Sequence, residues 1–169
     1  MRYGIEKDFF TTNELDNWKQ KFQLNSITNT KQGDPCWGID SKSLTYPWLK
    51  KVIMPVFSKH FNTDLKLVFA SYIDCTKIFR IHNDIKPLPE GATGKHFVSI
   101  LVPYAIDQKK ENFQRVATEF YTDEKKITDA IAWEENSFIW FESQIFHNSS
   151  NFKDKGIDSK QYFVFHTYV

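Results

Sequence analysis

From Leu65 to its end, the chain is a succession of apolar, aromatic-rich runs separated by turn residues. Such runs predict strands at 65–75, 77–82, 96–104, 115–122, 137–141 and 161–169, and a short helix is expected at 125–133. The sequence holds 16 Phe, 7 Tyr and 5 Trp, and broad rings suit a pleated, half-buried surface. Many strands joined by loops of varied length favour a double-sheet jelly roll.

The first 64 residues have a mainly helical pattern, after a short strand that is expected within the first ten residues and ends at Phe9 and Phe10. A Thr cap in the pair 11–12 followed by acidic residues, with apolar side chains at Leu15, Trp18 and Phe22, predicts a helix to about residue 24. The segment 25–45 is polar and rich in turn residues, which predicts a long loop.

A second helical pattern starts at Pro47, which suits the first position of a helix, and continues to about Phe61. Pro55 lies inside it and predicts a kink. The 169 residues suffice for one domain. We therefore expect a single domain, 1–169, in which a helical part, 1–64, supports a β core, 65–169.

The charges are balanced, with 22 Lys and Arg against 21 Asp and Glu. This balance gives no electrostatic signature of nucleic-acid binding and no polybasic membrane anchor. Cys36 and Cys75 have no metal-ligand or disulfide-framework spacing, so buried free thiols are expected. Without a signal-like start or a membrane-length apolar run, the sequence predicts a soluble, cytoplasmic protein. The oligomeric state stays open.

The motif with the clearest chemistry is His82-x-Asp84, at the end of an apolar run. Side chains alternate along a strand, so His82 and Asp84 are expected on the same face. His147 closes another apolar run and is the expected third ligand. Two His and one carboxylate form the facial triad that suits non-haem iron(II). Each piece alone is also compatible with ordinary surface or hydrogen-bonded residues, whereas their order and strand ends favour a metal site.

In these residues and their order, the chain resembles the iron(II)/2-oxoglutarate-dependent dioxygenases, especially the small prolyl-hydroxylase-like and phage-type members. The resemblance covers about 65–169. It implies a double-stranded β-helix, also called a jelly roll, with Fe(II) on His82, Asp84 and His147. It further implies 2-oxoglutarate as co-substrate and O₂ as oxidant, with release of succinate and CO₂ and hydroxylation of a small-molecule or peptide substrate.

The resemblance also implies a cation for the far carboxylate of 2-oxoglutarate. An Arg on the last strand is usual, but no Arg follows His147 in this chain. Lys160 is the expected substitute, and its long spacing from His147 requires an extra turn near Gly156. Arg80 is the reserve candidate, because alternation would place it on the face of His82. Lys160 as an ordinary solvated lysine is an equal alternative.

Other roles are assigned by the same reasoning. The resemblance implies that Tyr72 hydrogen-bonds the co-substrate carboxylate, although a strand Tyr is more commonly a core residue. The other three histidines, His60, His96 and His166, match no motif and are interpreted as structural or surface residues. The loops 85–95 and 25–45 are the expected substrate determinants, the first as a possible lid.

Two alternatives remain at this stage. A cupin-like metalloprotein would have a similar barrel, but it usually carries a His-x-His pair, which this chain lacks. A non-catalytic jelly-roll binding module would leave the three candidate ligands without a common purpose.

Overall fold

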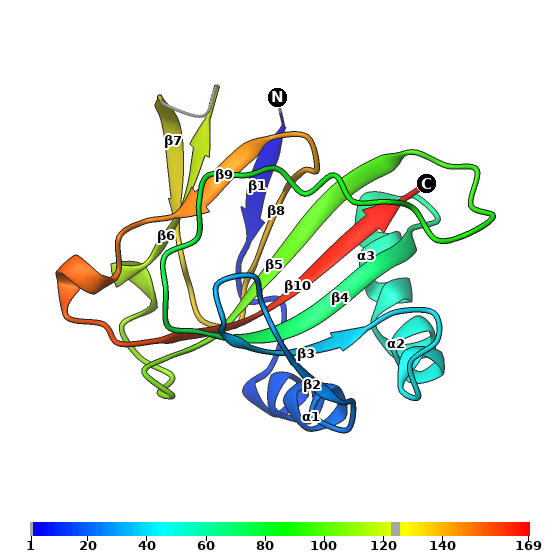
Figure 1. Cartoon of the computed structure of the whole chain (residues 1–169), viewed down its shortest axis with the longest axis horizontal. Coiled ribbons are helices and arrows are strands. Elements are labelled where there is room, and N and C mark those ends of the chain that lie inside the picture. The colour runs from blue at the N-terminus through cyan, green and yellow to red at the C-terminus, as the bar shows by residue number, and fades with distance from the viewer. Residues whose placement is uncertain (1, 123–125) are drawn as a thin grey trace.

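The computed structural model describes residues 2–122 and 126–169. Figure 1 shows a large antiparallel sheet, a smaller sheet at its upper left, and helices along the opposite side of the large sheet. In chain order the elements are β1 (Tyr3–Glu6), α1 (Thr12–Phe22), β2 (Ile27–Asn29), β3 (Pro35–Ile39), α2 (Tyr46–Val52), α3 (Met54–Phe61), β4 (Lys66–Cys75), β5 (His96–Ile106), η1 (Phe113–Arg115), β6 (Ala117–Tyr121), β7 (Ile127–Ala132), β8 (Phe138–Glu142), β9 (Phe146–Ser149), η2 (Lys153–Lys155) and β10 (Lys160–Tyr168).

Helix α1 forms where the sequence predicts it. Thr11 and Glu14 make a reciprocal capping box: the Glu14 amide donates to Thr11 Oγ1 at 3.1 Å, and the Thr11 amide donates to Glu14 Oε2 at 2.7 Å. The predicted apolar face, Leu15, Trp18 and Phe22, is buried. The helix therefore packs one face against the large sheet, although it ends at Phe22 rather than at residue 24.

The second helical pattern forms two helices rather than one kinked helix. Pro55 lacks an amide hydrogen and cannot continue a helix interior, so α2 ends at Val52 and Pro55 lies in the first turn of α3. Asn62 follows the last residue of α3 as its C-terminal cap, and its φ of 48° places it in the left-handed region.

The large sheet has the strand order β1-β8-β5-β10-β4-β3-β2, and the small sheet has the order β7-β6-β9. Strand β10 is central and pairs with both β4 and β5. The large sheet thus includes β1, β2 and β3 from the first 64 residues, which are not only a helical support as the sequence suggested. The segment 25–45 contributes β2 and β3 instead of forming one long loop.

Two apolar clusters occupy the two faces of the large sheet. Phe163 and Phe165 of β10 pack with the buried faces of the helices, whereas Tyr162 and Val164 pack in a second cluster with Phe120 of the small sheet. The alternation of strand side chains explains this division. The second cluster is therefore the core between the two sheets, and it surrounds the candidate site.

Two predicted elements are wrong. Residues 127–132 form strand β7 rather than a helix, because they pair with β6 in an antiparallel hairpin; Lys125, at the start of the predicted helix, lies outside the described residues. Residues 77–81 belong to no strand, since the chain leaves the large sheet after Cys75. Within the described ranges, no helix has the length and apolar character needed to cross a membrane.

Candidate metal centre

His82 and Asp84 are held by backbone bonds rather than by a strand of their own. The amide of His82 donates to the carbonyl of His147 at 3.1 Å, and the amide of His147 donates to the carbonyl of His82 at 2.8 Å. The amide of Asp84 donates to the carbonyl of Ser143 at 2.9 Å. These bonds fix residues 82 and 84 against the chain around β9, so the predicted proximity holds although the predicted strand does not.

His147 connects the small sheet to the segment that carries His82 and Asp84. It is part of β9, where it pairs with Phe120 of β6. Its side chain is buried, and its ring centroid lies 4.3 Å from that of Phe141. The pairing of β9 with β6 and the bridge to His82 therefore set the position of the third candidate ligand.

The three side chains meet. Nε2 of His82 lies 3.6 Å from Oδ1 of Asp84, and Nε2 of His147 lies 3.6 Å from Oδ2. All three candidate ligand atoms lie within 4.8 Å of one another. The side chain of His82 is 41% exposed, whereas Asp84 and His147 are buried. His82 therefore marks the side of the group that faces solvent.

Backbone carbonyls orient both imidazoles. Nδ1 of His82 lies 2.7 Å from the carbonyl oxygen of Arg80, and Nδ1 of His147 lies 3.1 Å from that of Ile145. A carbonyl oxygen only accepts, so each Nδ1 carries a proton, and each Nε2 is the nitrogen that faces Asp84. This is the tautomer in which a histidine binds a metal through Nε2.

The charges also suit a cation. Burial by itself would raise the pKa of Asp84, but the three surrounding imidazoles and the Ser99 hydroxyl hold that pKa well below its ordinary value. Burial lowers the pKa of His147. At neutral pH an ionised carboxylate thus faces the neutral imidazole of His147. Oδ2 of Asp84 is buried and has no hydrogen-bond partner among the described residues, so the donor set fits a divalent metal ion.

Lys160 begins β10, where it pairs with Cys75 on β4 and Ile106 on β5. It is 3% exposed, and its Nζ lies 4.9 Å from the ring centroid of Trp133 and 5.0 Å from that of Tyr162. Burial lowers its pKa to about 8, although nearby Cys75 and Asp34 act in the other direction. The interpretation of Lys160 as a solvated lysine is therefore wrong.

The extra turn expected before Lys160 is present. The 3-10 helix η2 is followed by Gly156, whose φ of 74° lies in the left-handed region. Arg80, the reserve cation, is exposed and lies in the irregular segment, so strand alternation does not assign its face. Its carbonyl, rather than its guanidinium, contacts His82.

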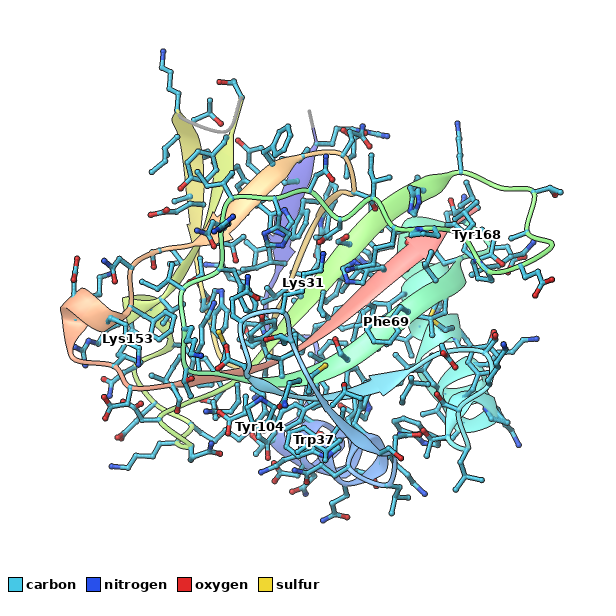
Figure 2. The ribbon with its side chains drawn as sticks, viewed as in Figure 1. Lys31, Trp37, Phe69, Tyr104, Lys153 and Tyr168 are labelled. Atoms are coloured by element: carbon cyan, nitrogen blue, oxygen red, sulfur yellow. The ribbon has the colours of Figure 1, made fainter. Side chains whose placement is uncertain are left out.

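The placement of Tyr72 contradicts its expected role. Tyr72 lies in the cluster on the helix side of the large sheet, and its ring centroid is 5.5 Å from that of Trp37 and 5.7 Å from that of Tyr104. Figure 2 shows Trp37 and Tyr104 beside α1. The neighbouring Ile73 and Cys75 face the other cluster. Alternation along β4 thus turns Tyr72 away from the candidate ligands. Trp37, its ring neighbour, packs against the same helix-side cluster.

Sequence reasoning missed two residues near the site. His166 is buried with its Nδ1 3.5 Å from Oδ2 of Asp84, and Tyr162 packs close to Lys160. Alternation along β10 could have found them, because Lys160, Tyr162 and His166 have the same parity.

Cys36 and Cys75 are buried and free, as predicted. Two hollows lie on the surface. One is lined by residues 110–114 and 134–135, and the other by Lys66, 91–94 and 168–169. Neither is lined by a candidate ligand, by Lys160 or by His166.

Comparison of sequences finds no matching family model and no matching curated protein. Solved structures do match. An oxidoreductase of the 2OG-Fe(II) oxygenase family from Burkholderia pseudomallei has a TM-score of 0.68 at 9% identity, over 98% of this chain and 85% of that chain. A prolyl-4-hydroxylase from Pseudomonas putida has a TM-score of 0.63 at 8% identity, over 98% and 91%.

A viral collagen prolyl hydroxylase from Paramecium bursaria Chlorella virus-1, solved as a 2OG complex, has a TM-score of 0.57 at 10% identity, over 99% of this chain and 95% of that chain. At such identities the likeness is one of fold. The chain has the fold of the 2OG-Fe(II) oxygenases, mostly β with N-terminal helices and a jelly-roll core. The fold class predicted from the sequence, and the resemblance behind it, are confirmed at this level.

Proposed function

We propose that the protein is a non-haem Fe(II)/2-oxoglutarate-dependent oxygenase that hydroxylates a small-molecule or peptide substrate. The observation that carries the proposal is the convergence of His82, Asp84 and His147, with both Nε2 atoms directed at one buried carboxylate. Two His and one carboxylate leave coordination positions open, which oxygen chemistry at iron(II) requires. The fold supports the proposal because its solved relatives are oxygenases of this type.

In this proposal each ligand has one task. His82 and His147 hold the metal through Nε2 while the carbonyls of Arg80 and Ile145 keep their rings in place. Asp84 supplies the negative charge from a buried position. Bound iron(II) supplies the activation of O₂ coupled to decarboxylation of 2-oxoglutarate.

Lys160 is the proposed partner of the far carboxylate of 2-oxoglutarate. It is a buried cation on the face of β10 that also carries His166, and among the described residues it has no ion pair within 4.0 Å. Burial is the main cause of the lowered pKa of His147, and the charge of Lys160 lowers that pKa further. A carboxylate between Lys160 and the metal would neutralise the lysine charge.

The substrate would approach from the exposed side of His82. Among the structural relatives, one is solved with hygromycin B bound and another is a collagen prolyl hydroxylase, so this fold serves both small and polymeric substrates. The loop 85–95 and the segment 25–45, which contains β2 and β3, keep their assignment as candidate substrate determinants. Hydroxylation is the reaction we propose for this chain.

An anaerobic titration tests the function. Fe(II) and 2-oxoglutarate added together to the wild-type protein should produce a weak visible charge-transfer band, and addition of O₂ should release succinate. The band should be lost in His82→Ala and kept in the control His60→Ala, whose imidazole lies 3.5 Å from Glu6 and outside the ligand group. A wild-type protein that folds but gives neither the band nor succinate would indicate a non-catalytic binding module.

A further inference from the structure

A third histidine lies directly beside the carboxylate of Asp84. His166 is buried on β10, with Nδ1 at 3.5 Å from Oδ2 of Asp84 and 3.2 Å from Oγ of Ser99. Ser99 is completely buried and is the direct partner of His166 across β5 and β10. His166 is not a member of the three-residue ligand group, so the ligand set does not explain why this imidazole is here.

The neighbours of His166 select one tautomer. His166 is buried, and Nδ1 is the ring nitrogen that faces both Asp84 and Ser99. Oδ2 of Asp84 is a buried acceptor without a hydrogen bond among the described residues. A lone pair on Nδ1 would repel this carboxylate oxygen, whereas an N–H at Nδ1 would be attracted to it. The 3.5 Å separation of Nδ1 and Oδ2 lies just beyond the ordinary length of an N–H···O hydrogen bond.

The three candidate ligands differ in what orients them. His82 and His147 are each fixed by a backbone carbonyl at Nδ1. The backbone amide of Asp84 is fixed by Ser143, whereas Oδ2 of its carboxylate has no hydrogen bond among the described residues to hold its rotation. Ligating carboxylates in metal sites are generally hydrogen-bonded in this way, and loss of the outer partner weakens metal binding.

We propose that His166 is a positioning residue of the metal centre: its Nδ1–H, shared with the Ser99 hydroxyl, holds Oδ2 of Asp84 and presents the carboxylate to the metal in one orientation. This inference rests on the proposed function. His166 touches the ligand and not the metal, so its effect appears in metal affinity and ligand field. The competing explanation is that the His166 ring only fills space between the sheets.

A matched pair of substitutions separates the two explanations. Asn and Leu have nearly the same shape, and Asn places its amide nitrogen about where Nδ1 of His166 stands, whereas Leu has no donor. Ni(II) affinity is measured by calorimetry, and the visible spectrum is recorded with Co(II), both without 2-oxoglutarate. We expect His166→Leu to bind Ni(II) roughly 10- to 100-fold more weakly than wild type and to shift the Co(II) bands. His166→Asn should lie closer to wild type than to Leu in both measurements.

Equal affinities and spectra for the Asn and Leu variants would overturn the inference, whether both match wild type or both are weakened, because the donor would then have no effect. If His166→Leu does not fold, His166→Gln replaces it, since its amide lies one bond too far, and it should be weaker than Asn. A folded wild-type protein that binds neither metal ion would instead contradict the proposed function, and this inference with it.

Discussion

Lys160 is the residue whose properties the sequence could least define and the structure defines best. Its position near the start of the last strand could be predicted from the sequence. Its burial, however, depends on the rings of Trp133, Phe152 and Tyr162, which come from different parts of the chain. A cation in such surroundings is costly unless an anion joins it. The co-substrate carboxylate is our proposed anion.

The affinity for 2-oxoglutarate should therefore depend on pH. The pKa of Lys160 is lowered to about 8, and binding requires the ammonium form, so affinity should be constant below that pH and fall toward about tenfold per unit above it. Of its titratable neighbours, Asp34 supports the ammonium form, and Cys75, with a pKa raised to about 11, and Tyr162, with a pKa raised well above its ordinary value, keep their protons below pH 9.5.

Calorimetry with the Ni(II)-loaded protein from pH 7 to 9.5 measures this dependence. Lys160→Met should bind 2-oxoglutarate on the order of 10- to 100-fold more weakly at pH 7, since a charge-assisted bond is lost, and should lack the fall above pH 8. Lys153→Met, on the exposed turn before β10, is the control. Unchanged affinity in Lys160→Met would move the anchor to Arg80 or elsewhere.

Alternation explains both the success and the failures at single residues. His82 and Asp84 were assigned to one face and do converge, because a backbone bridge to His147 holds them extended. Tyr72 was assigned by resemblance alone, and its parity on β4 turns it to the helix side. His166 has the parity of Lys160 but no motif, so its role became visible only when β10 was paired with β5.

Among the elements, the long buried strands could be predicted from the sequence, whereas the exposed ones could not. Strands β4, β5 and β10 are long, mostly apolar runs, and this pattern predicts buried strands. Strand β7 is almost entirely exposed, so its pairing with β6, rather than its own sequence, determines its structure. The run 77–82 resembles a strand, yet the backbone of His82 pairs with His147 of the small sheet instead of with a strand of the large sheet.

The return of the 85–95 loop to the sheet depends on a glycine. The amide of Lys95 donates to the carbonyl of Val169, and the amide of Val169 donates to that of Lys95, both at 3.0 Å. A Cβ on Gly94 would come within 2.1 Å of the Val169 carbonyl oxygen. No backbone atom can approach so closely, so the loop or the end of β10 would have to move.

We therefore expect Gly94→Ala to lower the free energy of unfolding by roughly 1–3 kcal/mol. The control is Thr93→Ala, at an exposed neighbouring position, which should change it by less than about 0.5 kcal/mol. Urea denaturation followed by fluorescence measures both. Equal stability of Gly94→Ala and wild type would show that the close approach of loop and strand is easily relaxed.

At the scale of the whole molecule, the candidate metal centre joins the parts of the fold. His147 belongs to the small sheet, His82 and Asp84 follow the large sheet's β4, and His166 lies on its central strand β10. The expected division into a helical 1–64 and a β 65–169 fails because β1, β2 and β3 complete the large sheet. The edge strand β2 and its neighbour β3, of three and five residues, carry too little apolar pattern to be found alone. The single domain spanning 1–169 stays a prediction.

Metal stoichiometry tests the central claim most directly. The protein is dialysed against Ni(II) at a free concentration above the dissociation constant, and bound metal per chain is measured by mass spectrometry. We predict one ion per chain for wild type and for His60→Ala, and much less than one for Asp84→Ala and for His147→Ala, with all four proteins folded by circular dichroism. One ion per chain retained in both Asp84→Ala and His147→Ala would contradict the assignment of the metal to this triad.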